Sequence, residues 1–196
     1  MEQYSLMETP FEFIPPRERN KKQTKQYFDW FLTQIDTRIE ILQNYIDKTS
    51  TKKIVLDKSP ESLIDLWEWF EDKIVEEKLT DEEIEKMLEG KNRFERDVLK
   101  DTTTKLSTLT LALALDISTY FGETMIHNNP VIYWGYETKP KMLIGVNQPM
   151  LLGFEHGELS LEQRNAVMVC IRRSIRKRNK MELFETYEIN ERHVKE

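Results

Sequence analysis

The chain has 196 residues, a length that suits one domain burying about 70% of the surface its unfolded form would expose. Lys and Arg total 29 against 35 Asp and Glu, so the net charge of −6 disfavours nucleic acid and anionic membranes as partners of the average surface. The single cysteine, Cys170, excludes an intrachain disulfide and a thiolate metal cluster, which favours a reducing, cytoplasmic location.

Three prolines within residues 1–20 predict an extended N-terminal arm that precedes a single domain over residues 21–196. Tyr4 and Phe13 are too apolar for a free tail, so we expect part of the arm to pack on the domain or on a partner. The segment lacks the basic region and apolar core of a secretory signal. No later run reaches the roughly 18 apolar residues of a membrane span, so neither export nor insertion is expected.

Apolar residues recur at intervals of three and four over residues 21–49, which predicts a long amphipathic helix. Ser59 followed by Pro60 is typical of a helix start, and the buried face of this second helix should extend to Ile74. Within it, Trp67 and Trp69 stand two residues apart and should not share one core, so we expect one of them to be partly exposed as an interface anchor. The alternative is that the N-terminal arm or a neighbouring helix covers it.

Thr80 and Glu83 form a capping box that predicts a third helix ending near Gly90. Residues 61–89 contain twelve acidic residues against three lysines. This excess is usual for solvated helix faces, and the alternative is an acidic surface aimed at a basic partner.

Residues 103–128 are apolar on nearly every side, which predicts a helix at the centre of the fold, stopped by Pro130. The short runs 131–137, 142–146 and 150–155 favour strands. The sequence therefore predicts an α+β fold, predominantly helical, with a long central helix packed on a small antiparallel sheet of about three strands.

Ser160 and Gln163 form a second capping box and predict a helix that extends to about Lys180. Residues 181–189 fit either a last strand or a helical turn. No repeat or convincing linker divides the chain.

Motifs of several common enzyme classes are missing. The six glycines form neither a P-loop nor a dinucleotide-binding GxGxxG, and there is no GxSxG or HExxH sequence. We therefore expect no cofactor and no resident metal.

Asp116, Tyr120, Glu123 and His127 share one side of the central helix, and carboxylates with an imidazole suit a metal or proton transfer. However, Asp116 and Glu123 lie about 10 Å apart along the helix axis, too far to share one ion. The alternative is that both acids bond to backbone groups of neighbouring segments and orient the helix. His127 suits a C-terminal cap, and His156 a turn.

Six basic residues lie within residues 172–180, where cations stabilise a helix C-terminus. The alternatives are binding to a nucleic acid, an acidic protein, or the 61–89 surface of another copy. No aromatic residue interleaves with the run, which weakens the case for nucleic acid. Its candidate contact residues are Arg172, Arg173, Arg176, Lys177 and Arg178.

The segment LALALDISTYFGETMIHNNPVIYWGYE, with the later NQPMLLGF, resembles a pattern of uncharacterised bacterial proteins: a core helix with Asp and Gly-Glu, then a strand with Trp. Some small α+β proteins of this kind are encoded beside polymorphic toxins and are regarded as immunity proteins, which bind and neutralise a toxin. The resemblance implies no catalytic residue. It makes Asp116, Gly122, Glu123 and Trp134 signature positions of the fold.

The leading hypothesis is a non-enzymatic cytoplasmic protein-binding domain, of immunity type, that meets a basic protein partner. Two alternatives are an enzyme with a pocket built on Asp116, Glu123 and His127, and nucleic-acid binding through the 172–180 run; a homo-oligomer is also open. The predicted partner-binding residues are Glu68, Trp69, Glu71, Asp72, Arg172, Arg173 and Arg176.

Overall fold

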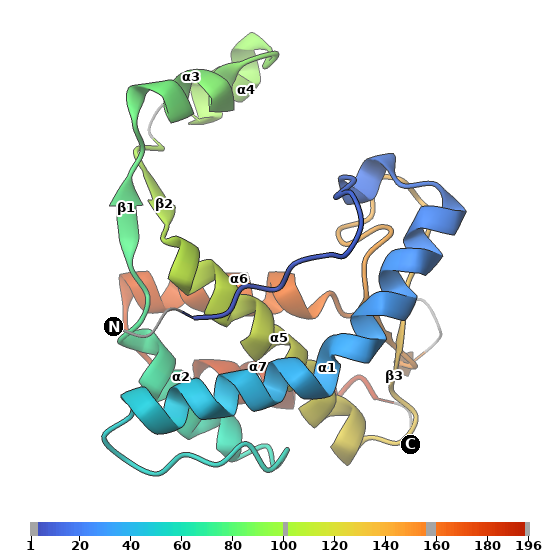
Figure 1. Ribbon diagram of the computed structural model, residues 1–196, viewed down its shortest axis with the longest axis vertical. Coiled ribbons are helices and arrows are strands. Elements are labelled where there is room, and N and C mark those ends of the chain that lie inside the picture. Colours follow the sequence, from blue (N-terminus) through green and yellow to red (C-terminus); the bar gives the residue numbers. More distant parts are fainter. Residues whose placement is uncertain (1–3, 100–101, 156–159, 195–196) are drawn as a thin grey trace.

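Helix α5 (Thr108–Asn128) runs through the centre of the protein in a computed structural model that describes residues 4–99, 102–155 and 160–194 (Figure 1). Helices α1 and α6 pack directly on α5, and α7 contacts α2, α5 and α6. These four helices are α1 (Lys21–Thr49), α2 (Ser62–Glu71), α6 (Gln163–Arg176) and α7 (Glu182–Glu191). A short 3-10 turn, η1 (Pro16–Glu18), precedes α1. The predicted α+β class, mostly helical, is confirmed.

Burial around α5 follows from its composition. Leu113, Thr119 and Met125 point to three different sides of the helix, and all are buried. A helix that is apolar all round stabilises a fold only when neighbours cover every side. The prediction of a central helix is therefore confirmed, although α5 begins at Thr108 rather than 103, capped by the side chain of Ser107.

Helix α1 matches its predicted bounds. Asn20 and Gln23 form a capping box at its start. Its buried residues recur at intervals of three and four, as an amphipathic helix requires. They are Thr24, Tyr27, Phe31, Ile35, Arg38, Leu42 and Ile46.

Both tryptophans of α2 are buried, so the expectation of one partly exposed Trp was wrong. Trp67 is fully buried, and its Nε1 donates to Ser174 Oγ of α6 at 3.1 Å. Trp69 is 6% exposed, lies edge-on to Tyr45, and its Nε1 donates to Thr49 Oγ1 of α1 at 3.3 Å. Helices therefore cover opposite sides of α2, and a spacing of two residues places one indole against each of them.

The predicted sheet is instead two separate two-stranded ribbons. Strand β3 (Tyr133–Gly135) pairs antiparallel with β4 (Met150–Leu152), and Tyr133 is opposite Leu152. The intervening run 142–146 was predicted as a strand, but it forms turns. Gly145 and Asn147 have φ values of 81° and 59°, which extended backbone does not allow.

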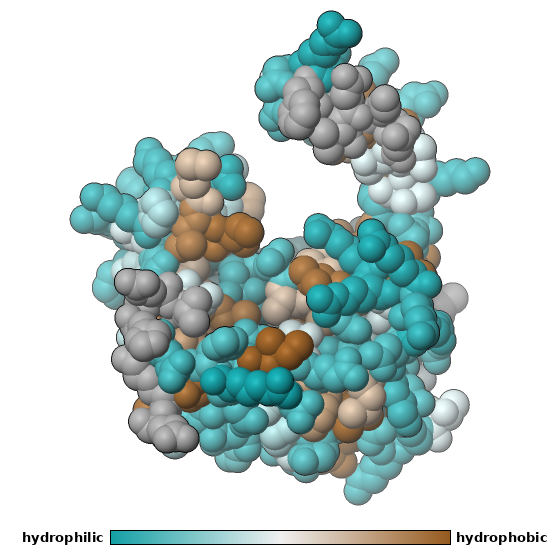
Figure 2. Space-filling view, turned by 180° about the vertical axis from the view of Figure 1, so that it is seen from behind, coloured by the Kyte–Doolittle hydropathy of each residue, from teal (hydrophilic) through white to brown (hydrophobic). Residues whose placement is uncertain are grey.

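The second ribbon carries a segment that the sequence did not reveal. Strands β1 (Glu76–Lys78) and β2 (Thr104–Leu106) pair antiparallel, and α3 (Asp81–Leu88) and α4 (Arg93–Leu99) lie between them. The Thr80–Glu83 capping box is confirmed at the start of α3. In this projecting segment (residues 76–106, described at 76–99 and 102–106), α3 and α4 stand clear of the rest of the molecule in Figures 1 and 2. None of its described side chains is buried.

The C-terminal third departs from prediction at both ends of α6, which stops at Arg176 rather than near Lys180. Glu162, rather than Ser160, caps α6, because its carboxylate accepts from Asn165 N at 2.7 Å. Leu161 is held extended by two backbone hydrogen bonds to Leu151, each 2.9 Å, so the helix cannot start at Ser160. The last run forms helix α7 rather than a strand, and His156 lies outside the described residues. No described helix combines the length and hydrophobicity that crossing a membrane requires.

Replacing residues 80–102 with Asn-Gly should leave the body of the protein folded. Leu79 N donates to Thr103 O at 2.9 Å, so the ribbon ends in a pair that a two-residue turn can close. Because the described side chains of this stretch are not buried, we expect the free energy of unfolding to fall by less than about 1 kcal/mol in urea denaturation. A loss above about 3 kcal/mol would show that the segment belongs to the core.

Candidate functional site

Asp116 lies at the centre of a buried cluster that joins three parts of the chain. Its Oδ1 accepts from Arg38 Nε at 2.9 Å, and its Oδ2 from Arg38 Nη2 at 2.5 Å and from the Tyr4 hydroxyl. Arg38 Nη2 also donates to the Ser5 carbonyl oxygen at 2.7 Å. The cluster therefore fixes the N-terminal segment to α1 and α5.

Burial sets the chemistry of this cluster. Asp116 is fully buried, and Tyr4 and Arg38 are 6% and 4% exposed. Desolvation raises the pKa of the Asp116 carboxyl, while hydrogen bonds from Arg38 and Tyr4 oppose that effect. Desolvation likewise raises the pKa of the Tyr4 hydroxyl. A bidentate guanidinium and a phenol offset the cost of burying the carboxylate, so its oxygens are committed to internal partners.

Tyr120 and Glu123 instead hold the loop before α2. The Tyr120 hydroxyl accepts from Lys58 N at 2.8 Å and shares a hydrogen bond of 2.6 Å with Ser62 Oγ. Glu123 accepts from Lys58 Nζ and from Trp134 Nε1, each at 2.8 Å. Lys58 has a φ of 62°, so these contacts hold a backbone conformation that a lysine rarely adopts.

The signature glycine of the central helix has a packing role. Gly122 lies directly beneath the indole of Trp134, so a Cβ at this position would collide with the ring. Since Trp134 also donates to Glu123 and packs edge-on against Phe31, the ring has little freedom to move. Gly122, Glu123 and Trp134 thus form one packing unit.

The four stripe residues do not converge on a shared site. Asp116 and Glu123 have separate sets of partners, and His127 is exposed at the end of α5. Hydrogen bonds from Ser59 lower the pKa of Asp57, and His127 adds to this shift through its charge. Asp116 and Glu123 accept hydrogen bonds from long side chains of other elements, so the expectation that they bond to backbone groups was wrong. Within the described part of the chain, no group of three His, Cys, Asp or Glu side chains could hold a metal ion.

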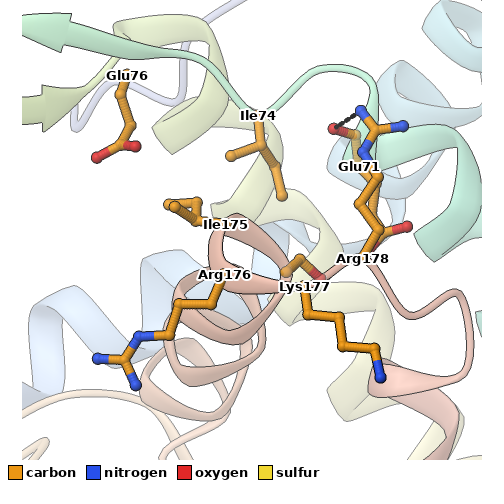
Figure 3. Close-up of a pocket in the computed structure, with 8 residues that line it drawn as sticks. Glu71, Ile74, Glu76, Ile175, Arg176, Lys177 and Arg178 are labelled. Atoms are coloured by element: carbon orange, nitrogen blue, oxygen red, sulfur yellow. Dashed lines mark hydrogen bonds between the residues drawn. The ribbon is translucent and has the colours of Figure 1, made fainter.

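The acidic end of α2 and the basic end of α6 bind each other. Arg178 Nη1 donates to Asp72 Oδ1 at 2.7 Å. Arg178 Nη2 donates to the Glu71 carbonyl oxygen at 3.2 Å, the bond dashed in Figure 3. Asn179 N donates to Glu71 Oε1 at 2.9 Å. Two predicted partner-binding residues, Glu71 and Asp72, are thus engaged within the chain.

A pocket of about 360 Å³ lies at this junction. Ile74 and Ile175 face it, whereas the charged ends of Arg176 and Lys177 extend away from Ile74 (Figure 3). Glu76 also lines the pocket. Because the charged groups do not converge on it, the pocket lacks the few aimed polar groups that fix a small ligand.

The remaining predicted contact residues divide into paired and unpaired groups. Lys52 bridges Asp65 and Glu68 at 2.8 and 2.5 Å, and Arg173 pairs with Glu182 at 2.8 Å. Within residues 4–99, 102–155 and 160–194, no ion pair involves the predicted contact residues Arg172 and Arg176. Trp69 is packed under Tyr45 and is not a surface anchor.

Exposed acids without an ion pair are found on α3, within a projecting segment that also exposes cations, among them Lys86, Arg93 and Arg96. Asp81, Glu82 and Glu85 of α3 are exposed and form no ion pair with any described residue. Glu83 is held by Lys105 of β2. Of the acidic run 61–89, the α2 half thus has Asp65, Glu68 and Asp72 in ion pairs with described residues, whereas α3 has only Glu83 so paired.

Comparisons with protein families, with curated proteins and with solved structures find no match to this chain.

Removing one member of the buried ion pair should cost more than removing both. We expect Arg38→Met to lower the free energy of unfolding by about 3–5 kcal/mol, because it leaves the Asp116 carboxylate buried without its cation. The double variant Arg38→Met/Asp116→Leu should be more stable than Arg38→Met in urea denaturation. A double variant as unstable as the sum of the two single variants would show that the charges do not act as a pair.

Proposed function

We propose that this protein is a non-enzymatic cytoplasmic domain that binds a basic protein partner through the acidic face of its projecting segment. Asp116, Tyr120 and Glu123 of α5 are committed to internal partners, which leaves recognition to the surface. The α2 acids, the other half of the acidic run, are mostly paired with Lys52 and Arg178.

The observation that carries the proposal is the combination of exposure and charge on α3. Asp81, Glu82 and Glu85 lie on a segment that stands away from the body and buries no described side chain (Figure 2). Apart from Leu106, which packs against the core, the described side chains of this segment take no part in it, so few packing constraints limit a role in recognition.

Electrostatics would favour association with a basic partner. Like charges clustered on a protruding surface steer an oppositely charged protein during diffusional encounter, and this effect weakens as salt rises. The role fits a domain of immunity type, in which binding alone neutralises the partner. Neither a cofactor nor a reactive side chain is needed for that function.

Charge reversal on α3 provides the test. In pull-downs from host lysate at low and high salt, we expect Glu82→Lys/Glu85→Lys to recover about tenfold less of a basic protein than the wild type does. The matched control is Asp36→Lys/Glu40→Lys, which reverses two exposed acids on α1. Quantitative mass spectrometry of the recovered proteins supplies the readout.

The outcome that supports the proposal is a salt-sensitive partner lost from the α3 variant and kept by the α1 control. If every recovered protein is retained equally by both variants, the α3 face is not the binding surface. Circular dichroism of each variant checks that the helices are intact.

A further inference from the structure

Arg19 is a buried cation at the junction of the N-terminal segment, the start of α1 and the 136–149 loop. It is 8% exposed, its Nε donates to the Ile14 carbonyl oxygen at 2.8 Å, and its Nη1 donates to the Asn147 carbonyl oxygen at 3.2 Å. The guanidinium carbon lies 3.8 Å from the centre of the Tyr27 ring and 5.6 Å from that of Phe13. Aromatic rings and carbonyl oxygens therefore surround the charge.

None of the described carboxylates forms an ion pair with Arg19. This contrasts with Arg38, the other buried arginine, which has Asp116 as its partner. Desolvation lowers the pKa of Arg19, and the charge of Arg164 adds to that shift. A buried guanidinium has five N–H donors; two of those of Arg19 donate to backbone carbonyl oxygens, and Tyr27 is a further side-chain hydrogen-bond partner. The Arg19 guanidinium thus retains positive charge and N–H groups that can donate to a ligand.

A pocket of about 140 Å³ adjoins Arg19. Its apolar walls come from the two ends of the site: Phe11, Phe13 and Ile14 of the N-terminal segment, and Tyr27 of α1. The volume is close to the roughly 150 Å³ of an apolar cavity known to hold benzene. A ring-sized apolar group therefore fits beside the guanidinium.

The surrounding charge also favours an anion. Arg17, Lys21 and Lys22 are exposed and near Arg19 in the sequence, as is one acid, Glu18, and the first turn of α1 carries no acidic residue. The positive end of the helix dipole adds to their field. Glu12 lines the pocket and opposes this field; it is exposed like the three cations, so solvent weakens all four charges to a similar degree.

We propose that this pocket binds a small aromatic carboxylate, with the carboxylate on the free N–H groups of Arg19 and the ring against the apolar walls. A planar carboxylate matches the guanidinium fork, and the bound anion would supply the counter-ion that the described residues do not. The inference does not depend on the proposed function, because the pocket lies at the start of α1 and the acidic face lies on α3.

Isothermal titration of the full chain with benzoate, benzamide and acetate at constant ionic strength tests the proposal. Benzoate should bind about tenfold or more tightly than either of the others, because benzamide lacks the charge and acetate lacks the ring. Equal binding of benzoate and benzamide would show that the pocket recognises the ring and not the carboxylate, which would contradict the proposal. The absence of saturable benzoate binding would overturn the proposal.

Two variants assign the binding to this pocket. Gln26 lines the pocket and is exposed, so Gln26→Glu adds a repelling charge without removing any contact of Arg19. Thr37→Glu adds the same charge at an exposed position of α1 away from the pocket. We expect benzoate affinity to fall about tenfold in Gln26→Glu and to be unchanged in Thr37→Glu.

Arg19→Lys keeps the charge but removes the planar fork, and we expect it to lose benzoate binding by about tenfold if it folds. Should that variant unfold, Gln26→Glu still decides the question, since it leaves the Arg19 contacts intact. Wild-type affinity in Gln26→Glu would contradict the proposed site.

Discussion

A fully buried carboxylate on the central helix is the constraint on which the structure depends. Asp116 cannot be left without partners in an apolar interior, so Arg38 of α1 and Tyr4 of the N-terminal segment must reach it. Those contacts fix the position of the N-terminal segment and the rotation of α1 about its axis. Such a pair contributes little net stability against an apolar replacement, and its main effect is to specify one arrangement.

The same constraint limits where the proposed partner could bind. Glu123 and Tyr120 follow Asp116 along α5, and they too are committed, to Lys58, Ser62 and Trp134. Groups that could have formed a catalytic pocket hold loops and neighbouring helices in place instead. Surface charge is then the main chemical feature left for a partner, and on the acidic side it is concentrated on α3 of the projecting segment.

Periodicity and capping boxes predicted α1, α3 and the central helix, because each of these rests on local rules of spacing and hydrogen bonding. Strands β1 and β2 were missed since Glu-Glu-Lys and Thr-Lys-Leu show no alternating apolar pattern. The partners of Asp116 were missed too, although one signal was present: Arg38 sits on the buried face of α1 between Ile35 and Leu42. A charged residue in an apolar stripe predicts a buried partner, and only the tertiary fold says which one.

Native-state hydrogen exchange tests most directly whether α5 forms the interior while the projecting segment stays outside it. The amides of residues 113–125 should open only with global unfolding, and those of α3 should exchange at least about a hundredfold faster through local opening. Equal protection of the two would mean that the segment packs into the core, and recognition through a free acidic face would then be untenable.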